Sequence, residues 1–253
     1  MELGPISEAL QIVTVKEVDN VGEFEVNGLY TGYGLTMGNA LRRVLLSSIP
    51  GAAITSAKIK GVGHEFSTIP NVAEDVVEIA INLKKIRFAM YTDEPQILLL
   101  HVKGEEKVTA AAIEENAQVS VISKDAHIAT LTTKGAELDI ELTVERGLGY
   151  LPVEARKSDK LPIGVVALDA FFSPVTKVNF VVENMRVGDR TDYNKLRLVI
   201  ETDGSISPSA ALKRAGEILK GHFEKVTTVE VKEAPKPEVE VEEKKAKRKK
   251  KAE

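Results

Sequence analysis

The sequence contains no cysteine and no tryptophan, and only 5% of its 253 residues are aromatic. Without cysteine, disulfides, thiolate catalysis, iron–sulfur ligation and cysteine zinc sites are excluded, and a cytosolic location is the simplest expectation. So few aromatic residues also argue against a stacking platform for single-stranded nucleic acid. No apolar run approaches the roughly 18 residues of a spanning helix, and the N-terminus lacks the features of a signal peptide. We therefore expect a soluble, intracellular, globular protein.

The sequence also lacks an excess of basic charge, because 34 Lys and Arg residues face 38 Asp and Glu residues and give a formal net charge of -4. This balance argues against a chain that coats DNA over its whole surface. The charge is unevenly distributed. Residues 234–253 carry 8 basic and 5 acidic side chains, which leaves 26 basic and 33 acidic side chains in the rest of the chain. An acidic body with a short basic tail is the result.

Period-two alternation of apolar residues indicates strands over much of the chain. The predicted strands are 22–30, 96–103, 119–122, 137–145, and segments around 178–182 and 196–200. Few helices interrupt them, and no regular alternation of strand and helix is present. The pattern predicts an α+β fold and not a doubly wound parallel sheet.

Three segments have apolar residues at helical spacing, at 36–49, 72–83 and 208–226. Thr36 is the expected N-cap of the first helix, and Asn71 with Glu74 offers a capping-box-like start to the second. Ser207 is the expected N-cap of the third, with Pro208 at its first helical position. The apolar stripe of the third helix is wide enough to serve two partners. After about residue 232 the hydrophobic period is lost, which predicts a disordered tail.

Motifs for nucleotide, metal or catalytic chemistry are missing. Gly32, Gly34 and Gly38 lie between a strand and a helix, but GYGLTMGNA matches neither a dinucleotide fingerprint nor a P-loop, so a tight turn feeding a helix is favoured. His64 and Glu65 resemble half of a zinc motif whose second histidine is missing. The sequence has no D-x-D-x-D cluster and no G-x-S-x-G elbow. We expect no catalytic residue, metal or cofactor.

The back of the 36–49 helix is more informative. At 3.6 residues per turn, Leu46 lies nearly opposite the apolar stripe, surrounded by Asn39, Arg42 and Arg43. Single exposed apolar residues are common, and this one is either ordinary or an anchor of a protein interface, in which arginine and apolar side chains concentrate the binding energy. The two arginines alone make a weak footprint for nucleic-acid phosphate.

The segment GYGLTMGNALRRVLLSSIPG resembles the hallmark segment of the alpha subunit of bacterial DNA-dependent RNA polymerase. The segments GVGHEFST, VERGLGYLPVEAR, LPIGVVALDAFFSPV and RTDYNKLRLVIETDGSISP resemble later motifs of the same family, in the same order. These matches cover roughly residues 5 to 230.

The resemblance implies a non-catalytic assembly subunit that homodimerises and forms the scaffold on which the beta and beta-prime subunits assemble. It also implies a discontinuous dimerisation domain, 1–50 and 173–232, an inserted strand-rich domain, 51–172, and a tail, 233–253. As part of the polymerase the protein is expected in the bacterial cytoplasm, associated with the nucleoid. The family normally continues into a C-terminal DNA-binding domain, so upstream DNA contact through that domain is not expected here.

The resemblance assigns interface roles to three sets of residues. The beta-subunit contacts fall on the first helix and on the H-E-F-S-T segment: Arg42, Arg43, Leu46, His64, Glu65, Phe66, Ser67 and Thr68. The beta-prime contacts fall on Lys84 and Leu168, although Lys85 stands where the family has glycine. The dimer contacts fall on the first and last helices: Met37, Leu41, Leu45, Leu212, Ala215, Leu219, Phe223 and Val226.

Two other functions compete with the scaffold. The first is a free-standing nucleic-acid-binding protein that uses the Lys-rich run from Lys244 to Lys251, although so dense a run is more often a solvated tail. The second is an enzyme built on His64 and Glu65, which would be active as the purified chain alone. The scaffold predicts instead a homodimer without its own activity, with DNA contact that is indirect or made through the tail.

Overall fold

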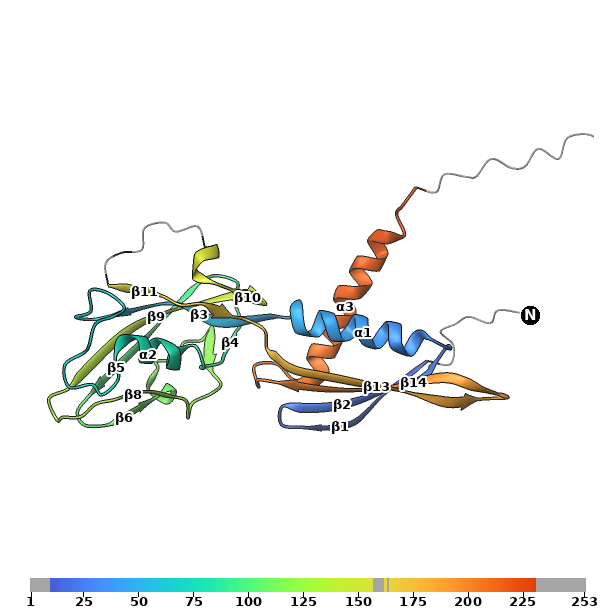
Figure 1. Ribbon diagram of the computed structural model, residues 1–253, viewed down its shortest axis with the longest axis horizontal. Coiled ribbons are helices and arrows are strands. Elements are labelled where there is room, and N and C mark those ends of the chain that lie inside the picture. The colour runs from blue at the N-terminus through green and yellow to red at the C-terminus, as the bar shows by residue number, and fades with distance from the viewer. Residues whose placement is uncertain (1–9, 157–161, 163, 231–253) are drawn as a thin grey trace, which may run out of the picture. The chain divides into compact units, whose positions relative to one another are not determined.

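The computed structural model describes residues 10–156, 162 and 164–230, and these residues contain three α-helices and fourteen β-strands (Figure 1). This confirms the predicted α+β fold. The described residues up to Leu219 form one compact unit, and those from Lys220 form a second. The predicted tail, including the run from Lys244 to Lys251, lies outside the described residues.

A four-stranded antiparallel sheet with the order β1-β2-β14-β13 is built from the two ends of the described chain. Its strands are β1 (Gln11–Val18), β2 (Val21–Leu29), β13 (Val175–Val187) and β14 (Arg190–Thr202). Helix α1 (Tyr33–Ser47) lies along one face (Figure 1). Apolar side chains from β2, β13 and β14 pack there against α1 and against the first half of α3 (Pro208–Val226). The opposite face of β14 carries charged side chains, such as Lys195 and Arg197, that pair with Glu25.

A second sheet is built from the middle of the chain, with six strands in the order β5-β9-β3-β4-β7 and with β11 added beside β3. These strands are β3 (Pro50–Ile59), β4 (Phe88–Met90), β5 (Gln96–Lys103), β7 (Val119–Val121), β9 (Glu137–Leu148) and β11 (Val165–Ala167). Its core is separate from that of the first sheet and includes helix α2 (Val76–Leu83). Two small ribbons complete the fold, β6 (Lys107–Thr109) with β8 (His127–Thr130), and β10 (Tyr150–Leu151) with β12 (Ala170–Phe171).

The predicted starts of the first two helices are wrong. Helix α1 begins at Tyr33, with Gly32 as its N-cap, and Thr36 lies inside its first turn. Helix α2 begins at Val76, because Asp75 is the residue whose carboxylate accepts the capping hydrogen bond. Asn71 has a positive φ of 63°, which lies outside the right-handed helical region, so this residue is not part of α2.

Glu74 explains why α2 starts late. Its carboxylate accepts hydrogen bonds from the Thr130 backbone N–H at 2.6 Å and the Thr130 hydroxyl at 3.0 Å, and Nε2 of His127 lies 2.9 Å from it. The Glu74 side chain is therefore bonded to β8 and cannot also cap the start of a helix as part of a capping box.

Helix α3 begins as predicted. Pro208 is its first residue, and the Ser207 hydroxyl accepts a hydrogen bond from the Ala210 N–H at 3.3 Å. Among the described residues, no helix is long and apolar enough to cross a membrane.

Candidate interaction surfaces

Helix α1 is held at its N-terminus by a side chain from β14. Asn194 is only 7% exposed, and its Oδ1 accepts hydrogen bonds from the backbone N–H groups of Gly32 at 2.8 Å and Gly34 at 3.3 Å. These N–H groups have no partner within the helix, so Asn194 acts as a cap supplied from elsewhere in the chain. Sequence analysis missed this residue, because it lies 162 positions after Gly32 and no local pattern links the two.

The glycines of the first helix segment seat the helix on the sheet. A Cβ atom on Gly34 would lie 2.6 Å from Cγ1 of Val182, and one on Gly38 would lie 2.7 Å from Cδ2 of Phe180. Gly32 has a φ of 87°, which favours glycine. The glycine-rich run thus forms a turn that feeds a closely packed helix, as the sequence predicts.

The outer side of α1 presents arginines, but not the leucine predicted beside them. Arg42 and Arg43 are exposed. Nε of Arg42 donates to the carbonyl of Val178 at 3.2 Å, whereas Arg43 has no ion-pair partner among the described residues. Leu46 is half-buried and packs against the core of the first sheet, so the prediction of an outward-facing leucine is wrong. The reason is that the chain before β13 crosses the end of α1, where Ser173 donates to the Leu46 carbonyl at 3.2 Å.

The H-E-F-S-T segment forms a tight exposed turn. The Ser67 N–H donates to the His64 carbonyl at 3.1 Å, and the Ser67 hydroxyl lies 3.2 Å from Nδ1 of His64. His64, Glu65 and Thr68 are exposed, and the side chain of Phe66 is 77% exposed. The turn is fixed to the start of α2, because the Val76 N–H donates to the Ser67 carbonyl at 3.2 Å. A phenylalanine held this far into solvent is a good candidate for a protein contact.

Lys84 is linked to the chain next to Leu168, because it pairs with Asp169, the residue that follows Leu168. Nζ of Lys84 lies 2.8 Å from Oδ2 of Asp169, whose Oδ1 accepts a hydrogen bond from the Val153 N–H at 3.0 Å. The hydrogen bond from Lys84, followed by that from Val153, lowers the pKa of the Asp169 carboxyl below its ordinary value. Lys84 is exposed, but Leu168 is only 2% exposed and belongs to the core of the second sheet.

Helix α3 divides its apolar residues between the protein's own core and solvent. Ala211 and Ala215 are fully buried, and Leu212, Ile218 and Leu219 are half-buried against the core. Phe223 and Val226 are 62% and 63% exposed. On α1, Leu41 and Leu45 are buried in the same core and Met37 is half-buried against it.

Tyrosines cluster around Arg190 near the start of α1, and no local sequence pattern predicts this cluster. The Arg190 guanidinium lies 5.1 Å from the ring of Tyr30 and 5.3 Å from that of Tyr193, and it makes two hydrogen bonds to Asp192 at 3.0 and 2.7 Å. The Thr31 hydroxyl also donates to Asp192 at 2.8 Å. These bonds, from Arg190 first and Thr31 second, lower the pKa of Asp192 to about 2. The turn is therefore an ordered structure that ties α1 to β14.

One group of side chains could hold a metal ion, His101, Glu137 and Asp139 on the outer face of the second sheet. His101 and Asp139 border a hollow of about 470 Å³ that Lys58, Lys60 and Glu141 also line. Lys60 lies 2.7 Å from Asp139, and Lys103 lies 3.0 Å from Glu137. A cation would have to displace these lysines, so the group is best described as a network of surface ion pairs.

Comparison with known proteins gives one consistent result. A family model described as the RNA polymerase Rpb3/RpoA insert domain matches residues 57–173. The chain is 48% identical over 222 residues to the DNA-directed RNA polymerase subunit alpha of Symbiobacterium thermophilum, covering 88% of this chain and 70% of that one. It is 49% identical over 220 residues to the same subunit of Alkaliphilus oremlandii, with 87% and 69% covered. For the subunit of a Roseiflexus species the identity is 50% over 217 residues, with 86% and 66% covered.

Proposed function

The chain belongs to the family of alpha subunits of DNA-directed RNA polymerase, which are non-catalytic subunits of this nucleotidyltransferase, and from this premise we propose how it assembles. Two copies of the chain dimerise, and the dimer is the platform on which the beta and beta-prime subunits assemble for DNA-templated transcription. The observation that carries the proposal is the distribution of apolar residues on α3. The helix buries Ala211 and Ala215, packs the half-buried Leu212, Ile218 and Leu219 against the core, and leaves Phe223 and Val226 in solvent.

A second copy of the chain is the partner proposed for these exposed side chains. Replacing Phe223 and Val226 by small polar residues would remove apolar surface that is buried only in the dimer. Leu41, Leu45 and Ala215 are buried in the core of one chain, so their proposed role in the dimer is to set the positions of α1 and α3. Met37, Leu212 and Leu219 are half-buried and could contribute their remaining area to the contact.

The dimer is tested by measuring the mass of the protein in solution over a range of concentrations. Phe223→Ser combined with Val226→Ser should convert the dimer to monomer while the circular dichroism spectrum remains that of a folded chain. Val181→Ser on β13 is the matched control, because Val181 is an apolar residue of similar exposure, 55%, that lies outside the helices. A wild-type chain that remains a monomer at every concentration, or a double variant that dimerises normally, would contradict the proposal.

The beta subunit is proposed to bind the outer side of α1 and the H-E-F-S-T turn. Arg43 is the principal contact, because Arg42 is already bonded to Val178 and supports the site from beside it. Phe66 is the apolar contact on the turn, with His64, Glu65, Ser67 and Thr68 around it. Leu46 contributes only the part of its side chain that remains exposed.

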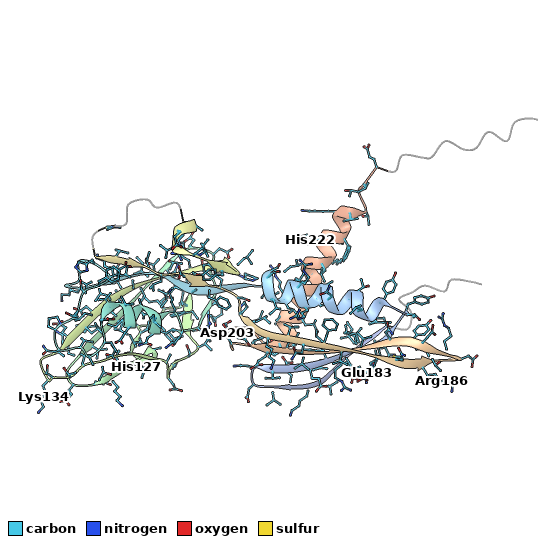
Figure 2. The ribbon with its side chains drawn as sticks, in the orientation of Figure 1. His127, Lys134, Glu183, Arg186, Asp203 and His222 are labelled. Atoms are coloured by element: carbon cyan, nitrogen blue, oxygen red, sulfur yellow. The ribbon has the colours of Figure 1, made fainter. Side chains whose placement is uncertain are left out.

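Replacement of Arg43 separates this contact from dimerisation. Arg43→Ala should leave the dimer intact and weaken capture of the beta subunit by roughly thirtyfold, corresponding to about 2 kcal/mol for an interface anchor. The control is Arg186→Ala, because Arg186 is also an exposed arginine and lies near the end of β13 (Figure 2). Normal capture of the beta subunit by Arg43→Ala would refute this assignment.

The beta-prime subunit is proposed to bind at Lys84 and the segment around Leu168. In this proposal the inserted domain, 51–172, contacts the large subunits, and 1–50 with 173–232 forms the dimerisation domain. The separate cores of the two sheets support this division. DNA contact is indirect, through the assembled enzyme on the nucleoid, or is made through the tail, 233–253.

A further inference from the structure

The ribbon of β10 and β12 displays two aromatic side chains to solvent. Tyr150 is 58% exposed and Phe171 is 44% exposed. The two residues are directly paired across the antiparallel ribbon, so their side chains leave the same face and lie side by side. Exposed aromatic pairs are costly to leave in water and are typical of the centre of protein interfaces.

Cationic side chains contact the β12 segment of the ribbon. The Arg87 guanidinium stacks over the Phe171 ring at 5.3 Å and donates to the Phe171 carbonyl at 3.2 Å. Lys84 bonds to Asp169, two residues before Phe171. Phe171 is therefore held in place before binding, and its ordering on binding would cost little conformational entropy.

The two cationic side chains near the pair, Lys84 and Arg87, each have a carboxylate partner. Nε of Arg87 lies 3.8 Å from Oδ2 of Asp203, which Figure 2 labels, and Lys84 is paired with Asp169. A partner is thus not attracted by net charge, and the apolar rings supply the contact area. Binding through them should depend only weakly on salt, because ion pairs are screened and apolar contacts are not.

Leu168 cannot itself supply this apolar contact. Its side chain is 2% exposed, and its N–H donates to the Thr55 carbonyl of β3 at 2.9 Å. It attaches the start of the β12 segment to the core, three residues before Phe171. A substitution at Leu168 would therefore disturb the aromatic pair without removing a direct contact.

We propose that Tyr150 and Phe171 form the apolar centre of the surface that receives the beta-prime subunit, and that Leu168 is a positioning residue for this pair. The proposal rests on the proposed function, which places beta-prime at Lys84, and the ribbon continues that surface through Asp169. The matching patch on the partner is apolar, with carbonyl or carboxylate oxygens that can reach Lys84 and Arg87 at its edge.

The test is capture of purified beta-prime by the preformed complex of the chain with the beta subunit, at low and at high salt. Tyr150→Ser and Phe171→Ser should each weaken capture by roughly tenfold at both salt concentrations, with dimer mass and beta capture unchanged. Tyr150→Phe and Phe171→Tyr should retain capture. Tyr91→Ser is the control, because Tyr91 is an exposed tyrosine, 72%, outside the ribbon.

A second measurement does not depend on removing packing. A photo-reactive benzoylphenylalanine placed at position 150 should crosslink to beta-prime, and the same group at position 91 should not. Leu168→Ala should lower both the melting temperature and beta-prime capture, as expected of a residue that acts through the ribbon.

The outcomes distinguish a failure of the ribbon proposal from a failure of the proposed function. If Lys84→Ala weakens beta-prime capture but the serine variants and the crosslink show no effect, the ribbon proposal is overturned and the site at Lys84 stands. If the wild-type complex fails to capture beta-prime at all, the proposed function is overturned. Weak capture by the serine variants together with a crosslink from position 150 supports both.

Discussion

Replacement of Asn194 by alanine should destabilise the protein through the loss of the cap of α1. The variant removes Oδ1 and leaves the N–H groups of Gly32 and Gly34 without their partner. Loss of an N-cap typically costs about 1 kcal/mol, and a buried N–H without a partner costs about 1–3 kcal/mol. Gly34 is buried and Gly32 is exposed to water that can replace the bond, so we expect a total of about 2–3 kcal/mol.

The assay is thermal unfolding followed by circular dichroism, in which this loss corresponds to about 5–10 °C for a domain of this size. Asn184→Ala is the control. It removes only the 3.4 Å contact between the amide of Asn194 and Asn184, and Asn184 is exposed, so its melting temperature should stay close to that of the wild type.

Asn194→Ala should also weaken capture of the beta subunit, because it alters the position of α1, and α1 carries Arg43. Asn194→Asp should recover part of the stability, because a carboxylate also accepts both bonds and is favourable at a helix N-terminus, although its burial carries a cost. An Asn194→Ala variant that melts within about 1 °C of the wild type would refute the reasoning, because loss of an N-cap lowers the free energy of unfolding by more than so small a shift indicates.

Three further predictions concern packing, pH and the tail. Gly38→Ala should destabilise the protein by about 1–3 kcal/mol in denaturant unfolding, because its Cβ would overlap side chains of β13 and β14; an unchanged midpoint would contradict this close approach. Burial raises the pKa of Glu74, but hydrogen bonds from His127 and then from Thr130 outweigh it and hold the pKa below its ordinary value. The stabilisation is therefore present above the unfolded pKa of about 4.3 and is lost as the pH falls through the lower folded value. Glu74→Gln should make the free energy of unfolding depend less on pH on the acid side, and a pH dependence identical to that of the wild type would refute this role of Glu74. Deletion of residues 244–253 should weaken binding of the isolated dimer to duplex DNA and reduce its salt dependence, whereas unchanged affinity would exclude the tail as a DNA contact.

Elements with complete local signals were predictable from the sequence. Strand β5, Gln96–Lys103, has the predicted bounds, because alternate residues enter the core along its whole length. The start of α3 is also as predicted, because Ser207 and Pro208 carry the whole capping signal themselves.

Elements determined by distant contacts were not predictable. Strand β1 was missed because all eight of its residues are exposed, so burial imposes no alternation on it. Strand β3 was missed because Pro50 and Gly51, which suggest a boundary, begin it. The start of α1 depends on Asn194 and that of α2 on the attachment of Glu74 to β8, and neither contact leaves a local pattern.

The interface residues show the same division. Arg43 and Phe66 are exposed, as a contact role requires; helical spacing predicts this for Arg43, whereas only the family resemblance points to Phe66. Leu46 is half-buried and Leu168 is buried, because chain segments distant in sequence pack against them, so a helical wheel or a motif match overstates their exposure. The aromatic pair of the ribbon, Tyr150 and Phe171, becomes visible only when β10 and β12 are paired.

The central claim, that this chain is the dimeric platform of the polymerase, is tested most directly by stepwise assembly followed by mass measurement. The purified chain is weighed alone, then after addition of the beta subunit, and then after addition of beta-prime. The account predicts a dimer first, then a complex of the dimer with one beta subunit, and then one that also contains beta-prime. A monomer that captures neither large subunit would contradict it.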